Sequence, residues 1–402
     1  MTLHQRKVPM PKLTLLGLLL IACILNFIGT VYSQDSVAES VASWQTPEDI
    51  DWDLIRQYRQ RFQQWNSYNE FWQNPITVTN EDSALYRRFM RLTRPHGAEL
   101  FSKGPQIGLT PLSELGSGTY FGETGGLYGD GRNDPPDVHR EAALRELARI
   151  SPLDDMGRES PDGKVVLLSI GVSNTTMEFS AFKKVADEDP DKAEHLLLVD
   201  GAYGGQSAGI TAFDSAPYWE FVDHQLNDSG ASALQVQVAW VKQVTVGPID
   251  PFPVEARILY SHLVGIMKIL RARFPNLRIA YLSSRIYGGY ASISIHTEPH
   301  AYETAFANRW LILDQIRGHP ELNYDPEQGS VLAPLLLWGP YMWADGLTPR
   351  QDGLIWEQKD FDPDGTHPNS SGQAKVTHML LEFFKTDPLA RTWFLGSRST
   401  PL

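Results

Sequence analysis

From residue 164 onward, short apolar runs alternate with longer segments of helical periodicity. Five runs are continuous enough to be buried strands, namely 165–170, 196–199, 234–241, 277–282 and 331–338. Between and after them, helices are expected over 176–186, from Pro253 onward, over 301–317 and over 370–385. Strands joined in this way predict an α/β fold with three layers, α/β/α, around a five-stranded parallel sheet.

The chain before residue 161 has a different pattern. Ile55, Tyr58, Phe62 and Trp65 are spaced as a helical stripe, and residues 101–137 are rich in glycine. A helix is expected over 139–150. The predicted organisation is therefore a signal peptide at 1–33, a helical and Gly-rich loop extension at 34–160, and the α/β domain at 161–402.

The first 33 residues have the features of an export signal. Arg6, Lys7 and Lys12 precede an almost wholly apolar stretch from 13 to 31. Cleavage after Ser33 would place the mature N-terminus at Gln34 in a secreted or periplasmic protein. Two alternatives stay open: a lipid on Cys23, since residues 20–23 resemble a lipoprotein cleavage box, and an uncleaved membrane anchor.

Net charge and cysteine content exclude several classes of partner and catalytic group. A formal net charge of −13, without a Lys/Arg run, argues against nucleic acid as a partner. The one cysteine, Cys23, lies in the export segment, so the mature chain has no disulfide, thiol nucleophile or cysteine metal site. No dinucleotide or phosphate loop is present, and Pro299 separates His296 from His300. No cofactor and no metal are expected.

The clearest chemical signal is the segment Asp364-Gly365-Thr366-His367-Pro368. An Asp and a His three residues apart on a turn are able to face one cleft. The Asp then fixes the imidazole tautomer, and the other ring nitrogen is left to take a proton from a hydroxyl. The alternative is an Asp-Gly turn with a surface histidine.

Two further segments follow predicted strands directly. Gly171-Val172-Ser173 places a serine at a strand-to-helix corner, where a helix N-terminus favours a developing oxyanion. The alternative for Ser173 is a simple helix cap. The loop Gly201-Ala202-Tyr203-Gly204 follows the second strand, and its glycines allow backbone N–H groups to approach a substrate oxygen.

In this order and at strand ends, the three segments resemble the SGNH (GDSL-type) hydrolases, a family of esterases and acylhydrolases. The resemblance covers residues 164–386, with Val172 in place of the family's Asp. It implies a flavodoxin-like sheet and a triad in which Ser173 attacks, His367 is the base and Asp364 orients it. It also implies an oxyanion hole made by the backbone N–H groups of Ser173 and Gly204.

The family's third segment, Gly-x-Asn-Asp, is missing. The third strand ends in Trp240-Val241-Lys242-Gln243, so the ammonium of Lys242 or the amide of Gln243 is expected to replace the asparagine as oxyanion donor. Gly131-Arg132-Asn133-Asp134 spells the missing motif but follows no strand, and is interpreted as a turn. Gly205-Gln206-Ser207-Ala208-Gly209 spells another nucleophile motif, but Ser207 lies too far past its strand.

Several aromatic residues lie near these strand ends and are candidates for stacking on a sugar ring, namely Tyr203, Trp240, Trp338 and Tyr341. The expected function is that of a secreted serine esterase acting on an acylated carbohydrate or another small ester. A non-catalytic carbohydrate-binding protein and an acyltransferase are the alternatives. A membrane is expected as a partner only through the N-terminal anchor or lipid.

Overall fold

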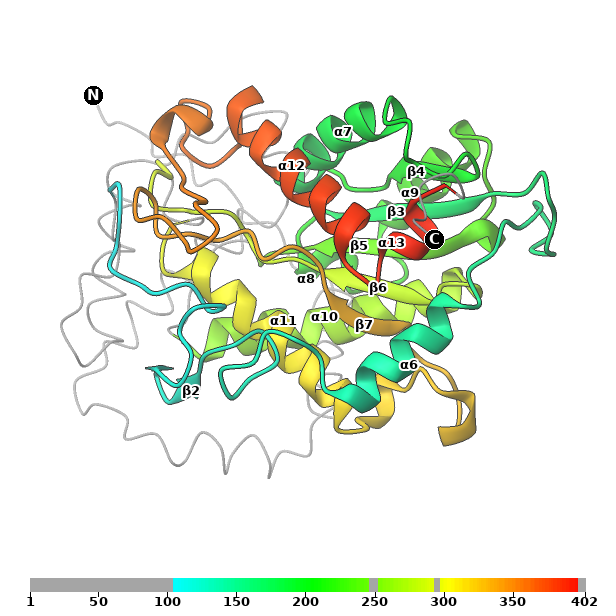
Figure 1. Cartoon of the computed structure of the whole chain (residues 1–402), viewed down its shortest axis with the longest axis horizontal. Coiled ribbons are helices and arrows are strands. Elements are labelled where there is room, and N and C mark those ends of the chain that lie inside the picture. The colour runs from blue at the N-terminus through cyan, green and yellow to red at the C-terminus, as the bar shows by residue number, and fades with distance from the viewer. Residues whose placement is uncertain (1–103, 246–251, 293–296, 397–402) are drawn as a thin grey trace, which may run out of the picture. The chain divides into compact units, whose positions relative to one another are not determined.

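The computed structural model describes residues 104–245, 252–292 and 297–396 (Figure 1). The predicted export segment and the predicted helices of residues 34–100 lie outside these residues. Five strands form one parallel sheet in the order β4-β3-β5-β6-β7. They are β3 (Val165–Gly171), β4 (Leu196–Asp200), β5 (Val236–Lys242), β6 (Ile279–Leu282) and β7 (Leu335–Trp338).

Helices cover both faces of the sheet, so the predicted α/β/α fold is confirmed. On one face, α7 (Ser173–Asp187) packs against α12 (Ser370–Thr386), and on the other α10 (Val254–Arg273) packs against α11 (His300–Ile316) (Figure 1). The chain moves from β3 outward to β4, then returns past β3 to β5. Connections between parallel strands are right-handed as a rule, which places the helices of these two connections on opposite faces. In agreement, α7 contacts α12 and α8 (Ala208–Thr211) contacts α10.

The sheet order predicts a binding position at the carboxyl ends of β3 and β5. The connection from β3 runs to β4 on one side and the connection from β5 runs to β6 on the other, and parallel α/β sheets bind ligands where neighbouring connections diverge in this way. The remaining helices are α6 (Asp137–Leu147), α9 (Pro217–Asp228) and α13 (Arg391–Phe394). Both α8 and α9 lie in the connection from β4 to β5.

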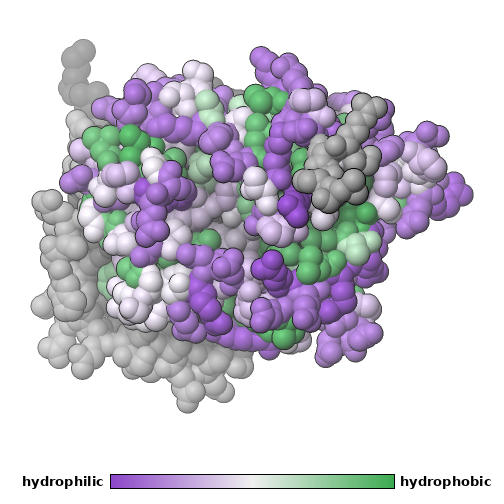
Figure 2. All heavy atoms as spheres, in the orientation of Figure 1, coloured by the Kyte–Doolittle hydropathy of each residue, from purple (hydrophilic) through white to green (hydrophobic). Residues whose placement is uncertain are grey.

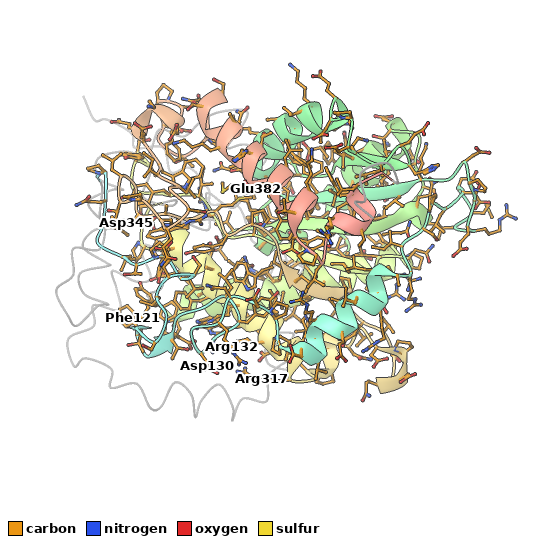
Figure 3. All side chains as sticks on the ribbon, in the orientation of Figure 1. Phe121, Asp130, Arg132, Arg317, Asp345 and Glu382 are labelled. Atoms are coloured by element: carbon orange, nitrogen blue, oxygen red, sulfur yellow. The ribbon has the colours of Figure 1, made fainter. Side chains whose placement is uncertain are left out.

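The described part of the Gly-rich segment packs onto the sheet domain. It contains a small hairpin of β1 (Thr119–Tyr120) and β2 (Glu123–Thr124). Asp345, labelled in Figure 3, accepts hydrogen bonds from the backbone N–H groups of Ile107 (2.7 Å) and Gly108 (2.8 Å). Leu112, Tyr128 and residues of α6 join the same hydrophobic core as the strands. Residues 104–160 therefore share one core with the α/β domain.

Element boundaries differ from the prediction at a few ends. The third strand begins at Val236 because residues 233–235 form a 3₁₀ turn closed by a capping box from Ser232. The last strand begins only at Leu335, directly after Pro334, which has no N–H for the sheet. Helix α7 begins three residues earlier than predicted, at Ser173 itself.

The surface is mixed in character. On the face shown in Figure 2, polar residues surround smaller groups of apolar residues. Within the described ranges, no helix has the length and apolar character that crossing a bilayer requires.

Candidate active site

Ser173 stands at a sharp corner between β3 and α7. Val172 is extended (φ −101°, ψ −168°) and Ser173 is already the first residue of the helix. The corner requires glycine at position 171, since a Cβ there would lie 2.2 Å from Thr175 Oγ1 and 2.4 Å from the Lys242 carbonyl oxygen. The sequence thus places a serine hydroxyl at the positive end of a helix dipole.

The structure brings Ser173, His367 and Asp364 into one hydrogen-bonded series, although Ser173 and His367 are 194 positions apart. Ser173 Oγ lies 2.8 Å from His367 Nε2, and His367 Nδ1 lies 2.5 Å from Asp364 Oδ2. With the Nδ1 proton donated to the carboxylate, Nε2 is the acceptor for the serine proton; this tautomer is assigned from its partners. The arrangement is able to activate a hydroxyl nucleophile.

Asp364 is held as an anion. Burial by itself would raise the pKa of this carboxyl, but hydrogen bonds from the His367 ring and from two backbone N–H groups bring it below its usual value. These N–H groups belong to Thr366 (2.8 Å) and His367 (3.0 Å), and both donate to Asp364 Oδ1. One oxygen therefore shapes the turn while the other faces the imidazole.

The Asp364–His367 turn is the tip of a short hairpin. Asp362 N–H donates to the His367 carbonyl (2.8 Å), and Phe361 pairs with Pro368 in an antiparallel bridge. Gly365 has a positive φ of 67°, and its α-carbon lies so close to the Tyr290 carbonyl that no side chain would fit.

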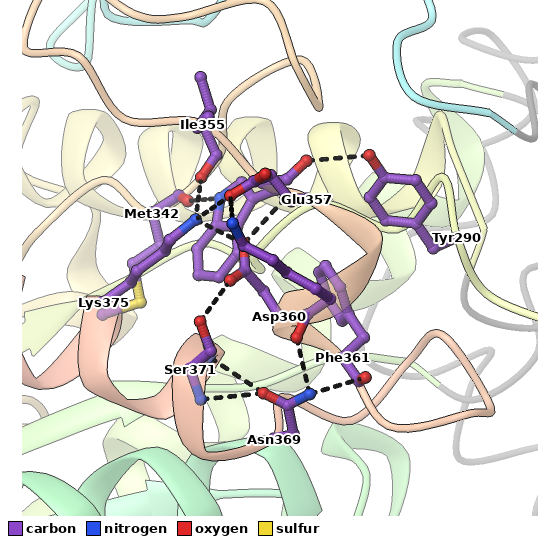
Figure 4. A network of polar contacts seen from close by, with 12 residues as sticks. Tyr290, Met342, Ile355, Glu357, Asp360, Phe361, Asn369, Ser371 and Lys375 are labelled. Atoms are coloured by element: carbon purple, nitrogen blue, oxygen red, sulfur yellow. Dashed lines mark hydrogen bonds and ion pairs between the residues drawn. The ribbon is translucent and has the colours of Figure 1, made fainter.

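A buried carboxylate closes the base of this hairpin (Figure 4). Asp360 accepts from Lys375 Nζ (2.5 Å), Ser371 Oγ (2.7 Å) and the backbone N–H of Glu357 (2.8 Å). Asn369 caps α12 through Ser371 N–H (2.9 Å) and donates its amide to the Phe361 carbonyl (2.9 Å). Both ends of the turn that carries Asp364 and His367 are therefore fixed to the start of α12.

Asn174 joins the two halves of the site. Its buried amide donates to the Thr366 carbonyl (2.9 Å), so the residue after Ser173 binds the turn that carries His367. This contact of Asn174 was not predicted from the sequence. Asparagine beside a serine at a helix start has the appearance of a cap, and no local pattern identifies a partner 192 positions away.

Gly204 lies directly against Ser173. A Cβ on Gly204 would meet Ser173 Cβ at 3.8 Å, and the Tyr203 N–H donates to the Gly171 carbonyl (3.1 Å). Within the described residues no acceptor takes the Gly204 N–H, and Ser173, as the first helical residue, has no intrahelical acceptor for its own. Both backbone donors named in the sequence analysis thus lie at the serine.

The expectation that Lys242 donates to the oxyanion is wrong, because its ammonium is bound elsewhere. Its ammonium does not face the space above Ser173 but lies 2.6 Å from each carboxylate oxygen of Glu178, and the two side chains are 2% and 0% exposed. The Lys242 carbonyl accepts from Thr175 Oγ1 (2.7 Å). Burial lowers the pKa of Lys242 and raises that of Glu178, while their mutual attraction opposes both shifts. The pair fastens the first two turns of α7 to the end of β5.

Gln243 is not an oxyanion donor in this structure either. Its amide nitrogen donates to the Gln206 carbonyl (3.2 Å) and to Thr211 Oγ1 (3.1 Å). Gln243 thus binds the loop that follows β4, at Gln206, which is two residues beyond Gly204. Neither of the two side chains that the sequence suggested as oxyanion donors is therefore directed at the serine.

Three of the four aromatic candidates are packing residues, which corrects their predicted role in substrate binding. Trp240 is fully buried and its indole N–H donates to Ser283 Oγ (3.0 Å). The indole N–H of Trp338 donates to the Leu127 carbonyl (2.7 Å), and Tyr341 Oη accepts from the backbone N–H of Leu112 (3.1 Å). Only Tyr203, which is 49% exposed, presents a ring to solvent.

The other sequence candidates take structural positions. Asn133 crosslinks the Gly-rich loop, donating to the Ser113 carbonyl (2.7 Å). Ser207 precedes the short helix α8, well past the end of β4 at Asp200. His296 lies outside the described residues. Among residues 104–245, 252–292 and 297–396 there is no group of three or more His, Cys, Asp or Glu side chains able to hold a metal ion.

A second buried carboxylate, also missed from the sequence, organises the loops beneath the Asp364 turn. Glu298 accepts from the N–H groups of Gly288 (2.7 Å) and Tyr302 (3.1 Å) and from Trp343 Nε1 (2.8 Å). The segment beginning at Gly288 ends at Ser292, whose N–H donates to the Asp364 carbonyl (2.7 Å). Three segments of the carboxyl edge therefore meet at Glu298.

Glu298 is expected to make stability depend on pH. Burial raises its pKa from 4.5 to about 7, so the folded state holds a proton that the unfolded state releases. As pH rises from about 4.5 to 7, wild type should lose about 3 kcal/mol of unfolding free energy relative to Glu298→Gln, which cannot ionise. Denaturant midpoints of the two proteins across this pH range measure the effect. Parallel curves would show that Glu298 does not titrate in this window.

No family model and no curated protein matches this chain. Solved structures match at a distance. A Bacteroides fragilis protein provisionally assigned as an acylhydrolase is 11% identical, with a TM-score of 0.33, over 65% of this chain and 100% of its own. The periplasmic domain of a lipopolysaccharide acetyltransferase from Salmonella ser. Paratyphi A is 13% identical, with a TM-score of 0.33. The match covers 61% of this chain and 96% of the acetyltransferase domain. A salicylyl-acyltransferase from a tetracycline biosynthetic pathway is 15% identical, with a TM-score of 0.29, over 58% of each chain. Similarities this distant do not define a function.

Proposed function

We propose that this chain is a serine esterase of the SGNH type. The observation that carries the proposal is the hydrogen-bonded series from Ser173 Oγ through His367 to Asp364 at the carboxyl edge of a parallel sheet. Nucleophile, base and orienting carboxylate are the three parts that acyl transfer by a serine requires.

In the first half-reaction, Ser173 Oγ attacks the ester carbonyl carbon while His367 Nε2 takes the hydroxyl proton. The negative charge that develops on the carbonyl oxygen is stabilised by the N–H groups of Ser173 and Gly204 and by the N-terminus of α7. The C–O bond to the alcohol then breaks, and the imidazolium returns its proton to the leaving alkoxide. Asp364 stabilises the imidazolium while it exists.

In the second half-reaction, a water molecule gives its proton to His367 and attacks the acyl group on Ser173. When the second tetrahedral intermediate collapses, the bond from the acyl carbon to Ser173 Oγ breaks, and His367 Nε2 returns its proton to Oγ. The acid is released and the serine is restored. An alcohol in place of water would make the same chain an acyltransferase. Because Lys242 and Gln243 are bound to other partners, we assign the oxyanion hole to the backbone N–H groups of Ser173 and Gly204 and to the helix end. Each oxyanion donor is typically worth about 10²- to 10³-fold in kcat, so we expect a slower enzyme than one with three donors.

Hydrolysis of p-nitrophenyl acetate tests this function. Wild type is expected to release p-nitrophenol with saturation kinetics, and Ser173→Ala is expected to abolish the activity. Added methanol separates the two reactions, since an acyltransferase forms methyl acetate in excess over acetate. A folded wild type with no turnover and no acylated Ser173 would favour the non-catalytic binding protein.

We also propose that residues 1–33 export the protein, based on the basic start and the apolar stretch that follows. N-terminal sequencing of the protein from its native cells should then begin near Gln34. Fatty-acid labelling of Cys23 would favour the lipoprotein alternative, and an intact cytosolic chain would contradict export.

A further inference from the structure

One aromatic side chain stands out at the carboxyl edge of the sheet. Tyr203 is 49% exposed, whereas Trp240 is fully buried and Trp338 and Tyr341 are nearly so. A single exposed ring is common on protein surfaces, so the position and contacts of Tyr203 decide whether it has a role.

Tyr203 lies beside the nucleophile. Its N–H donates to the Gly171 carbonyl (3.1 Å), at the corner that precedes Ser173. The next residue, Gly204, lies in contact distance of the Ser173 side chain and carries a proposed oxyanion donor. The backbone of Tyr203 is thus fixed against the corner, and its ring leaves the chain within one side-chain length of the site.

The ring is also held in one orientation. It stacks on Phe221 of α9 with ring centroids 4.5 Å apart and planes 24° from parallel. Phe221 packs on the hydrophobic core, and Tyr218, Trp219 and Val222 of the same helix are buried. Since Phe221 covers one face of Tyr203, the exposed area is the opposite face and the edge. A ring fixed before binding loses little conformational entropy when a ligand covers it.

We propose that Tyr203, supported by Phe221, is the surface on which a ring of the substrate stacks, so that the site prefers esters that carry a ring with an apolar face beside the ester group. The apolar C–H face of an acylated sugar has this chemistry, and so does an aryl ring. This inference rests on the proposed esterase function and names the substrate class of that same site.

The test compares two alkyl acetates that differ in the ring, methyl 6-O-acetyl-glucopyranoside and ethyl acetate. Tyr203→Ala should raise KM for the acetylated glucoside about 3- to 10-fold relative to its effect on ethyl acetate, because one stacking contact is worth about 0.5–1.5 kcal/mol. The glucoside kcat should be retained, since stacking binds the ground state and the transition state equally. Tyr203→Phe should behave as wild type, and Phe221→Leu should show part of the Tyr203→Ala effect.

Phe213 provides a matched control. It is 59% exposed, but the next residue, Asp214, pairs with Arg273 at the far end of α10, away from the carboxyl edge. Phe213→Ala should therefore leave the ratio of the two KM values unchanged. Phenyl acetate as a third substrate distinguishes the ring types: a Tyr203→Ala effect on phenyl acetate alone would assign the surface to aryl esters.

Other outcomes overturn the proposal. An equal rise in KM for ethyl acetate, no rise for either ring ester, or a fall in kcat alone would show that Tyr203 does not contact a ring. Hydrolysis of ethyl acetate without hydrolysis of either ring ester would also overturn it, yet would leave the esterase function standing. Failure of that function is recognised separately, by the absence of both turnover and acylation at Ser173.

Discussion

Replacing Asp364 with asparagine is expected to lower kcat about 10⁴-fold in a protein that still folds. Asparagine keeps the oxygen that accepts from the Thr366 and His367 N–H groups, so the turn is retained. Its amide nitrogen would face His367 Nδ1 and, being a donor, would favour the tautomer with the proton on Nε2. That nitrogen could then no longer take the proton of Ser173.

Asp362 supplies the matched control for this experiment. It lies in the same hairpin, and its backbone N–H, not its side chain, bonds the His367 carbonyl (2.8 Å). Asp362→Asn should therefore retain kcat in the p-nitrophenyl acetate assay. Full activity in Asp364→Asn, with circular dichroism showing a native fold, would remove Asp364 from the mechanism.

Replacing Lys242 with methionine is expected to destabilise the fold by about 3–5 kcal/mol, because it leaves the buried carboxylate of Glu178 without its partner. The double variant Lys242→Met, Glu178→Leu removes both charges and should recover most of this loss, since apolar replacement of a buried ion pair is often neutral or stabilising. Denaturant unfolding of the three proteins measures the two effects.

The activity of the double variant separates a structural role from a chemical one. With the ammonium held by Glu178, Lys242 makes no contact with the oxyanion, and the folded double variant should keep kcat within a few-fold of wild type. A recovered fold with kcat still lowered about 10²- to 10³-fold would show that Lys242 stabilises the oxyanion after all.

The fold was predictable because its signals are local. Each parallel strand is buried on both faces and therefore appears as a continuous apolar run, as Val165–Ile170 does. The Ser173 corner was visible for the same reason, since Gly171, the strand end and the helix start are consecutive. The Asp364–His367 contact lies within four residues of chain, so spacing alone indicated it.

The roles of Lys242 and the tryptophans were not predictable from local pattern. The partner of Lys242 is Glu178, 64 positions earlier, on a helix whose face toward β5 is set by the packing of the whole sheet. The partner of Trp338 is also distant in the sequence, because the segment that covers its ring, near Leu127, belongs to the Gly-rich loop. A residue at the carboxyl end of a strand faces either the substrate site or the loops and helices that cover the sheet, and the sequence does not show which of the two it faces.

Asn174, Asp360 and Glu298 escaped the sequence analysis for a related reason. Asn174 and Glu298 bind backbone groups of other segments, and any residue type can supply a backbone group. Asp360 binds the side chains of Ser371 and Lys375, which lie 11 and 15 positions further along the chain. Asp360 in particular lies outside the Asp-x-x-His motif, and only the hairpin geometry of residues 361–368 places it at the base of the turn.

Labelling with a fluorophosphonate shows whether Ser173 is an activated nucleophile. This probe reacts with serines activated by a base and marks the residue that it modifies, whatever the natural substrate. One phosphonylated residue, Ser173, is expected by peptide mass spectrometry, with labelling lost in Ser173→Ala and strongly slowed in Asp364→Asn. A folded protein that stays unlabelled, or that is labelled at Ser207 instead, would contradict this expectation.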